Sequence, residues 1–179
     1  MVRNFLKNLL NYTGWFPRKS TKVSRREFLF LTGGMFLMGK YLSPHFTASE
    51  CNCNGTGKLP WDDGLEQDQF MAFLELLEAI RKEWGSRPIV VNSFYRSPEY
   101  NNKISSTGPA GPHTGKGGGF AVDVGVSGGQ ALDLIQVARE VNLTNVQPIQ
   151  GIGIKGTGPH AKRFVHLDNL PRKALWSYS

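Results

Sequence analysis

The chain has 179 residues, 40% of them hydrophobic, which suits one compact domain with an additional N-terminal segment. Its formal net charge of +7 is uneven, because residues 1–50 hold eight Lys and Arg against two acidic residues, whereas the rest holds 13 basic and 12 acidic residues. We therefore expect no basic surface on the folded part, which argues against nucleic-acid binding as its function.

The N-terminal arm, residues 1–50, has the layout of an export signal. The letters SRREFLF at 24–30 place paired arginines at the start of a mildly apolar run, and small residues at 47–49 are a candidate cleavage site. The pattern Ser-Arg-Arg-x-Phe-Leu resembles the twin-arginine signal for the export of folded proteins. It implies the twin-arginine export machinery as a partner, a periplasmic or extracellular location, and membrane contact only during export. The alternative is an uncleaved membrane anchor, but the apolar run is shorter than the roughly 20 residues of a span.

The two cysteines, Cys51 and Cys53, lie in a CNC sequence. A disulfide between them would be strained, and two thiolates do not complete a closed zinc site. Residues 51–63 are therefore predicted to be a linker, whose cysteines pair at most between chains. The folded domain is expected to span residues 64–179.

Residues 64–84 have the clearest helical periodicity in the chain. Apolar side chains recur on one face of this segment, namely Phe70, Phe73, Leu74, Leu77, Ile80 and Trp84. Acidic residues near its start and basic residues near its end suit the helix dipole. We expect this helix to belong to the core, and residues 88–93 to form the strand that follows it.

Arg96 follows this strand at a turn, because the next two residues are Ser-Pro, which disfavours a helix there. A guanidinium in that place can bind a carboxylate through two hydrogen bonds, or pair with Glu99 at the surface. Residues 102–119 are predicted to form a long glycine-rich loop. Its GKGGG letters lack the spacing of a phosphate-binding loop, which argues against nucleotide binding.

The segment PHTGKGGGFAVDVGV, residues 112–126, combines a histidine, this loop and a predicted strand at 120–126. Side chains alternate along a strand, so Asp123 lies on the small-residue face, opposite an apolar face. Burying an unpaired carboxylate is costly. Asp123 therefore needs a partner, and His113 and His166 are the candidates.

Residues 128–142 are predicted to form a second helix, and residues 150–155 and 163–168 two further strands. In the last strand, RFVHLD, His166 and Asp168 share the face opposite Val165 and Leu167. Two histidines and an aspartate on polar strand faces are typical of a zinc site with one open position for water. The predicted fold class is α+β, a small antiparallel sheet flanked by helices.

Three motifs, in order over roughly residues 65–170, resemble one family. SFYRSPEYN resembles the Ser-Gly-Tyr-Arg-Ser-x-x-x-Asn signature of zinc D-Ala-D-Ala carboxypeptidases. PHT…GFAVD resembles their Ser-x-His-x-x-Gly-x-Ala-x-Asp motif, and GIGI…FVHLD resembles their closing Gly-Ile-Gly…Phe-Val-His-x-Asp. The resemblance implies the fold shared with the hedgehog signalling domain, and it makes residues 64–179 the expected catalytic domain.

By position, the resemblance implies a Zn²⁺ cofactor with ligands His113, Asp123 and His166. It implies that Arg96 binds the substrate carboxylate or steadies the tetrahedral intermediate. Tyr95 belongs to the same motif and is a candidate for substrate binding or for shaping the loop.

The chain also departs from the family pattern. Nine residues separate His113 from Asp123, where the family usually has six. Many relatives carry an acid as general base three residues before the last histidine, and that residue is Arg163 here. Asp168, on the strand face of His166, and His160, which titrates near neutrality, are the candidates that replace it.

The expected function is that of an exported zinc metallopeptidase acting on D-amino-acid-containing bonds in the stem peptides of peptidoglycan, as a carboxypeptidase or a cross-link endopeptidase. One alternative is a zinc-containing but inactive cell-wall binding module, which the missing acid at Arg163 would allow. Another is a structural periplasmic protein in which the histidines are merely packed.

Overall fold

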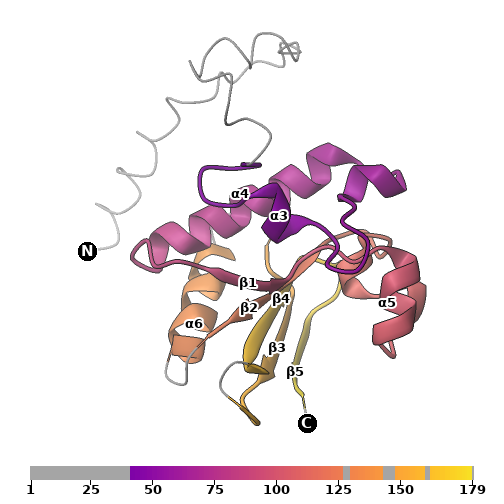
Figure 1. The fold of residues 1–179 in the computed structure, drawn as a ribbon. Helices are drawn as coiled ribbons and strands as arrows, with labels where there is room; N and C mark the ends of the chain where they lie inside the picture. The colour runs from indigo at the N-terminus through magenta and orange to yellow at the C-terminus, as the bar shows by residue number, and fades with distance from the viewer. Residues whose placement is uncertain (1–40, 127–129, 143–147, 160–161, 179) are drawn as a thin grey trace, which may run out of the picture. The chain divides into compact units, whose positions relative to one another are not determined.

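The chain divides into two units, Met1–Phe36 and Leu37–Ser179, and every residue described here belongs to the second. The structure, a computed structural model, describes residues 41–126, 130–142, 148–159 and 162–178. Figure 1 labels its helices, α3 (Ala48–Cys51), α4 (Gln67–Glu83), α5 (Pro98–Ile104) and α6 (Gln130–Asn142), and its strands, β1 (Val90–Ser93), β2 (Ala121–Gly125), β3 (Gly151–Lys155), β4 (Phe164–Asp168) and β5 (Ala174–Ser177). Three short 3-10 helices lie between them, η1 (Pro60–Asp63), η2 (Gly108–Ala110) and η3 (Pro112–Thr114). This α+β arrangement confirms the predicted fold class.

The described strands form one sheet in the order β1-β2-β4-β3-β5. The pairs β1-β2, β2-β4 and β4-β3 are antiparallel, as predicted, but β5 lies parallel to β3. The sheet is therefore mixed. Strand β5 was not predicted from the sequence.

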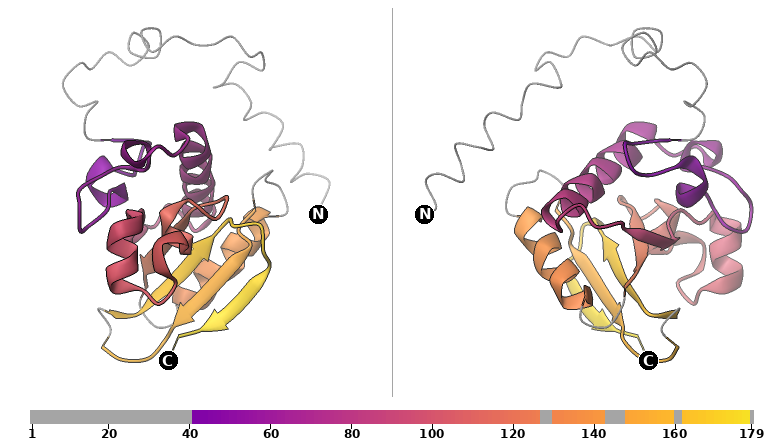
Figure 2. Two further views of the ribbon diagram at one scale, coloured as in Figure 1. Left: turned by 90° about the vertical axis from the view of Figure 1, so that its right-hand side faces the viewer. Right: turned by 60° about the vertical axis from the view of Figure 1, so that its left-hand side comes forward.

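The core lies between one face of the sheet and the helices α4 and α6 (Figures 1 and 2). Its strand residues, all buried, are those of the predicted apolar faces, Phe120, Val122, Val124, Val165 and Leu167. Helix α4 adds Phe70, Phe73, Leu74, Leu76, Leu77 and Ile80. The periodicities of 3.6 and 2 residues thus predicted the main part of this core, although not Leu76.

The packed domain begins earlier in the chain than the sequence suggested. Phe46 is 1% exposed, and Cys51 and Cys53 are fully buried. Cys51 and Phe46 belong to the same core cluster as α4, and a capping box at Thr47 and Glu50 starts helix α3. Much of the expected linker and the end of the expected export arm are therefore part of the domain.

The region after β1 is also more ordered than the predicted glycine-rich loop. Helix α5 begins directly after Ser97, whose side chain caps it by accepting a hydrogen bond from the Tyr100 amide. Proline at the first helical position is compatible with a helix that starts there. The Ser97-Pro98 pair therefore marks the start of a helix rather than excluding one. After α5, the chain passes through η2 and η3 before it reaches β2. None of the helices among the described residues is long and apolar enough to span a membrane.

Candidate metal centre

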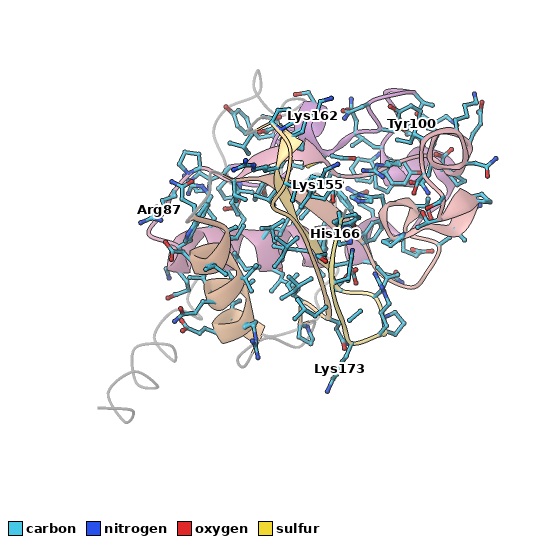
Figure 3. All side chains as sticks on the ribbon, turned by 90° about the horizontal axis from the view of Figure 1, so that it is seen from below. Arg87, Tyr100, Lys155, Lys162, His166 and Lys173 are labelled. Carbon is cyan, nitrogen blue, oxygen red and sulfur yellow. The ribbon has the colours of Figure 1, made fainter. Side chains whose placement is uncertain are left out.

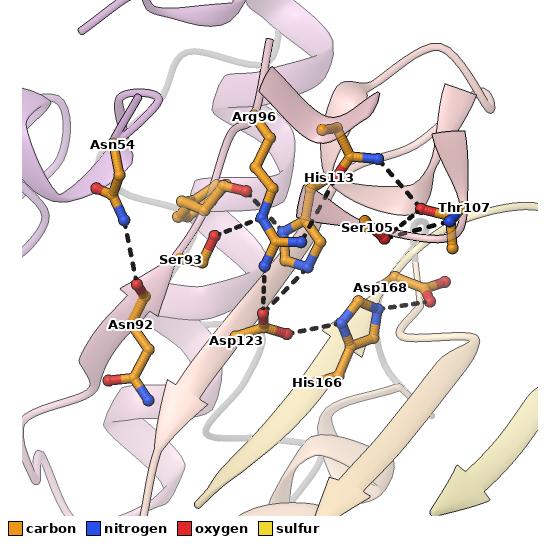
Figure 4. A network of polar contacts seen from close by, with 12 residues as sticks. Asn54, Asn92, Ser93, Arg96, Ser105, Thr107, His113, Asp123, His166 and Asp168 are labelled. Atoms are coloured by element: carbon orange, nitrogen blue, oxygen red, sulfur yellow. Dashed lines mark hydrogen bonds and ion pairs between the residues drawn. The ribbon is translucent and has the colours of Figure 1, made fainter. Parts of the chain in front are cut away.

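Three titratable side chains meet on the sheet face opposite α4 and α6 (Figure 4). Asp123 on β2 and His166 on β4 are direct antiparallel partners, so both side chains leave the sheet on the same face. His113 comes from η3, which lies before the glycine-rich segment 115–119 that leads to β2. The extra residues of this loop do not prevent His113 from reaching Asp123.

The distances join these groups into one cluster. His166 Nδ1 lies 2.8 Å from Asp123 Oδ1, and His113 Nε2 lies 3.3 Å from Asp123 Oδ2. One ligand atom from each of the three residues lies within 4.8 Å of the other two, and all three residues are buried. Ligand atoms around a tetrahedral zinc are about 3.4 Å apart, given bonds of about 2.0–2.2 Å. The donor set fits a zinc ion after small side-chain adjustments.

The second nitrogen of each imidazole already has a partner. His113 Nδ1 lies 2.7 Å from the Phe94 carbonyl oxygen, which can only accept, so Nδ1 donates and Nε2 is left to bind a metal. His166 Nε2 lies 3.1 Å from Asp168 Oδ2, on the side of the ring away from Asp123. Such outer hydrogen bonds fix the tautomer and the orientation of metal-binding histidines.

Burial and charge shift the pKa values of these groups in different directions. Burial lowers the pKa of His113, which keeps the imidazole neutral as a ligand requires. Burial opposes protonation of His166 as well, but the hydrogen bonds with Asp123 and Asp168 raise its pKa. Burial also opposes ionisation of Asp123, yet the imidazoles of His113 and His166 hold its pKa well below the ordinary value. Asp123 is therefore a carboxylate, ready to bind a cation.

The glycines of the GIGI strand make room for this cluster. Across the β3–β4 pair, Gly151 lies opposite Asp168 and Gly153 opposite His166. A Cβ on Gly151 would collide with the Asp168 carboxylate, and one on Gly153 would lie 2.5 Å from the Trp176 ring. These two positions therefore need glycine because other side chains occupy the space above them.

Arg96 is turned toward the metal-binding aspartate. Its NH2 group donates to Asp123 Oδ2 at 2.8 Å, and its Nε donates to Ser93 Oγ at 2.8 Å (Figure 4). The side chain is 16% exposed. Arg96 thus lies at the centre, where its guanidinium contacts Asp123. The alternative partner, Glu99, pairs with Lys103 instead.

Two further predicted site residues can be compared with the structure. Tyr95 is 1% exposed and its hydroxyl donates to Asp63 at 2.6 Å, which contradicts substrate binding and gives it the loop-shaping role. Asp168 is fully buried, with Oδ2 bound to His166 and Arg172 and Oδ1 accepting from the Leu170 amide. It is thus placed to hold His166 rather than to reach a water at the ligand side of the ring.

The remaining candidate for the missing base is His160, and the position of the family's acid is Arg163. His160 lies outside the described residues. Arg163 donates from Nε to the Gly158 carbonyl oxygen at 3.0 Å. Its position therefore offers no carboxylate to the centre.

Three residues beside the centre were not predicted from the sequence. The Arg172 guanidinium donates to Asp168 at 2.6 Å and also lies over the Trp176 ring, 5.0 Å from its centroid. The Trp176 ring in turn lies 5.2 Å from the His166 ring, and Tyr178 follows directly after the end of β5. The spacing of two between Trp176 and Tyr178 was the available signal, since it is the alternation of a strand.

The fold and this centre define a protein with a buried His-Asp-His group that could hold one metal ion on a mixed sheet. The sequence model of the family peptidase M15 matches residues 44–168, and the chain belongs to that family. The family is one of zinc peptidases, so the chain is by family a hydrolase of peptide bonds. Neither a curated protein nor a solved structure matches the chain.

Proposed function

We propose that this protein is an exported zinc peptidase that cleaves D-amino-acid-containing peptide bonds in peptidoglycan. The observation that carries the proposal is the buried cluster of His113, Asp123 and His166, with one ligand atom of each within 4.8 Å of the others. Family membership supports the reaction class, and the Ser-Arg-Arg-x-Phe-Leu letters at 24–29 support export of the folded chain.

The chain's own residues have distinct roles in this proposal. His113 Nε2, Asp123 and His166 Nδ1 hold the zinc, while the Phe94 carbonyl and Asp168 fix the two imidazoles. When bound, zinc lowers the pKa of its water toward about 7 and polarises a carbonyl group. Asp168 is a positioning residue, because both of its oxygens are already engaged.

Arg96 is the proposed contact for a peptide carboxylate or for negative charge that develops on the peptide. Its Nη1 atom lies 3.5 Å from Asn101 Oδ1 and is less firmly engaged than Nη2, which donates to Asp123 at 2.8 Å. A guanidinium can present two parallel donors to a carboxylate. His160 stays the candidate proton acceptor, proposed from its place in the sequence just before β4.

The test is digestion of muropeptides by the zinc-loaded protein, with product analysis by chromatography and mass spectrometry. We expect the wild type to cleave the muropeptides, and cleavage to be lost when a chelator is added and in His166→Ala. The matched control is His45→Ala, which should still cleave, because His45 is an exposed residue that pairs with Glu78. Loss of a terminal D-Ala identifies a carboxypeptidase, and loss of cross-linked dimers an endopeptidase. Binding of cell-wall sacculi without any cleavage, in wild type and His166→Ala alike, would overturn the proposal in favour of a binding module.

Export has a separate test. Replacement of Arg25 and Arg26 by lysines should retain the protein inside the cell, as detected by fractionation. Equal export of the substituted and unsubstituted chains would contradict the twin-arginine route.

A further inference from the structure

We propose that the C-terminal strand supplies a substrate-contacting wall to the metal centre, in which Tyr178 donates a hydrogen bond to the bound peptide. We call this wall the aromatic ledge, and it consists of Phe164, Trp176 and Tyr178. The inference rests on the proposed function and names the residues that would hold the stem peptide beside the metal.

The register of the sheet places the ledge next to the metal ligands. Asp123, His166, Gly153 and Trp176 are successive partners across β2, β4, β3 and β5, so they form one row on one face. The absence of a side chain on Gly153 lets the Trp176 ring approach to 5.2 Å from the His166 ring. Figure 3, seen from below, shows His166 close to this C-terminal strand.

Tyr178 continues the ledge two residues further along. The Tyr178 backbone amide donates to the Ile154 carbonyl oxygen at 2.9 Å, which extends the β3–β5 pairing by one residue. Its ring lies 5.9 Å from that of Trp176 and 5.1 Å from that of Phe164, which shares the β4 face of His166. All three ledge residues are half-buried, so part of each ring is left for a ligand.

Contacts of the Trp176 ring with Arg172 and Tyr178 define the position of that ring. One contact is with the Arg172 guanidinium, 5.0 Å from the ring centroid, and the same guanidinium is anchored to Asp168 at 2.6 Å. Another is the edge contact between the Trp176 and Tyr178 rings, whose centroids lie 5.9 Å apart. The ledge is therefore linked through Arg172 and Asp168 to the metal ligand His166, and its geometry depends on the same residues.

The Tyr178 hydroxyl lies in the electrostatic field of the metal centre. Burial raises the pKa of this hydroxyl, the contact with Trp176 and the charge of Arg96 lower it, and the carboxylates of Asp123 and Asp168 raise it. The group therefore stays protonated at neutral pH and can donate. A peptide held at the metal offers carbonyl and carboxylate oxygens to such a donor, while the methyl groups of alanine suit the aromatic rings.

The chain offers a clean pair of variants for the test. Tyr178→Phe removes only the hydroxyl, whereas Leu175→Ala alters a residue of the same strand that is 73% exposed and points to the other face. Trp176→Phe keeps an aromatic ring over Gly153 but loses the N–H group. Zinc content and thermal unfolding are measured for every variant, to show that each is folded and metal-loaded.

Two readouts keep this inference separate from the proposed function. The first is kcat/KM on muropeptides with zinc-loaded protein, and the second is the dissociation constant of the same muropeptides with chelated protein, measured by calorimetry. For Tyr178→Phe we expect kcat/KM to fall and the dissociation constant to rise, each about 3- to 10-fold, as for one lost neutral hydrogen bond. Trp176→Phe should change both quantities in the same direction. Leu175→Ala should leave both unchanged.

Each combination of results decides something. Equal cleavage and binding by wild type and Tyr178→Phe would overturn the ledge and leave the peptidase proposal standing. Binding without cleavage by wild type, weakened by Tyr178→Phe but not by Leu175→Ala, would support the ledge and overturn the peptidase. A wild type that neither cleaves nor binds muropeptides would overturn both.

Discussion

At the scale of single residues, the centre depends on polar contacts that surround the metal ligands. Arg96 and two imidazoles meet the Asp123 carboxylate, and Asp168 meets the far side of His166. Isolated buried charges would be very costly, and this mutual pairing offsets the cost. The outer hydrogen bonds of His113 and His166 leave one nitrogen of each imidazole close to the Asp123 carboxylate, where the three groups could share a metal ion.

The role of Asp168 can be tested through metal affinity. Asp168→Asn keeps the size of the side chain but removes the charge that faces His166 and Arg172, so we expect zinc affinity to fall about 10- to 100-fold. A competition titration with a chromophoric chelator measures it. Asp133→Asn, at a side chain that is 61% exposed, is the control and should match wild type. Unchanged affinity in folded Asp168→Asn would show that Asp168 does not position the ligand.

Gly153 offers a test of close packing. A Cβ there would lie 2.5 Å from the Trp176 ring, so Gly153→Ala should lower the free energy of unfolding by about 1–3 kcal/mol, the usual range for overpacking. Urea unfolding followed by circular dichroism measures the change. Gly156→Ala, with nothing within 4 Å of the added Cβ, should unfold at nearly the wild-type urea concentration. If both variants unfold alike, the Trp176 ring does not occupy the space above Gly153.

At the scale of elements, the segment before α4 belongs to the packed domain. Phe46, in the turn before α3, is 1% exposed and lies in the same core cluster as α4. A hydrogen bond from the Ser43 hydroxyl to Glu78 at 2.7 Å ties the same turn to that helix. A cleavage at residues 47–49 would therefore remove a core side chain.

This attachment predicts a large effect of truncating Phe46. Phe46→Ala should lower the free energy of unfolding by about 3–5 kcal/mol, the usual cost of removing a buried phenylalanine ring. Leu132→Ala, at a leucine that is 72% exposed on α6, should cost far less. Chemical denaturation measures both. A small loss for Phe46→Ala would place the start of the domain after this turn and restore the cleavage site at residues 47–49.

The junction between η1 and the segment after β1 carries a pH-dependent contact. Burial raises the pKa of Asp63, but the hydrogen bonds from Lys58 and Tyr95 outweigh it and hold the pKa below the ordinary value. A lowered folded-state pKa contributes stability that is present above the unfolded pKa, near ~4, and is lost as the pH falls through the folded value.

We therefore expect Asp63→Asn to be less stable than wild type at pH 6, and its stability to fall less on going to pH 3. Thermal unfolding over this pH range measures the difference. Asp68→Asn, at the exposed start of α4, should follow the wild-type curve. Parallel curves for Asp63→Asn and wild type would contradict the pairing with Lys58 and Tyr95.

At the scale of the whole molecule, the excess of basic residues and the proposed metal ligands lie in different parts of the chain. Residues 1–40 hold eight basic residues and one acidic residue, whereas residues 41–179 hold 13 of each. Residues 41–179 therefore have no net formal charge to attract a polyanion, which agrees with the proposed function at the buried cluster. Its three proposed ligands come from η3, β2 and β4, so metal binding joins segments that are distant in sequence.

A bound metal that joins these segments should stabilise the whole fold. At free zinc 100-fold above its dissociation constant, the gain is about 2.7 kcal/mol. This gain corresponds to a rise in Tm of roughly 5–10 °C for a chain of this size. Differential scanning calorimetry with zinc and with a chelator measures it, and His166→Ala should show no shift. An equal shift in both proteins would place the zinc elsewhere.

The sequence by itself determined the core and the composition of the centre. Apolar periodicity fixed which faces of α4, β2 and β4 are buried, because burial of those faces is the main driving force of folding. The same alternation forced Asp123 and His166 onto the other face. These are local properties of the chain, and each can be derived from a short stretch of letters.

Only the tertiary structure decided how these faces meet. The β2–β4 register placed Asp123 opposite His166, and the parallel pairing of β5 brought Trp176 over Gly153. It also buried Phe46, against expectation from the sequence, and turned Tyr95 toward Asp63, which fits the loop-shaping role among its two expected roles. Strand register and the docking of short segments depend on contacts between distant residues, whose partners no local pattern of letters specifies.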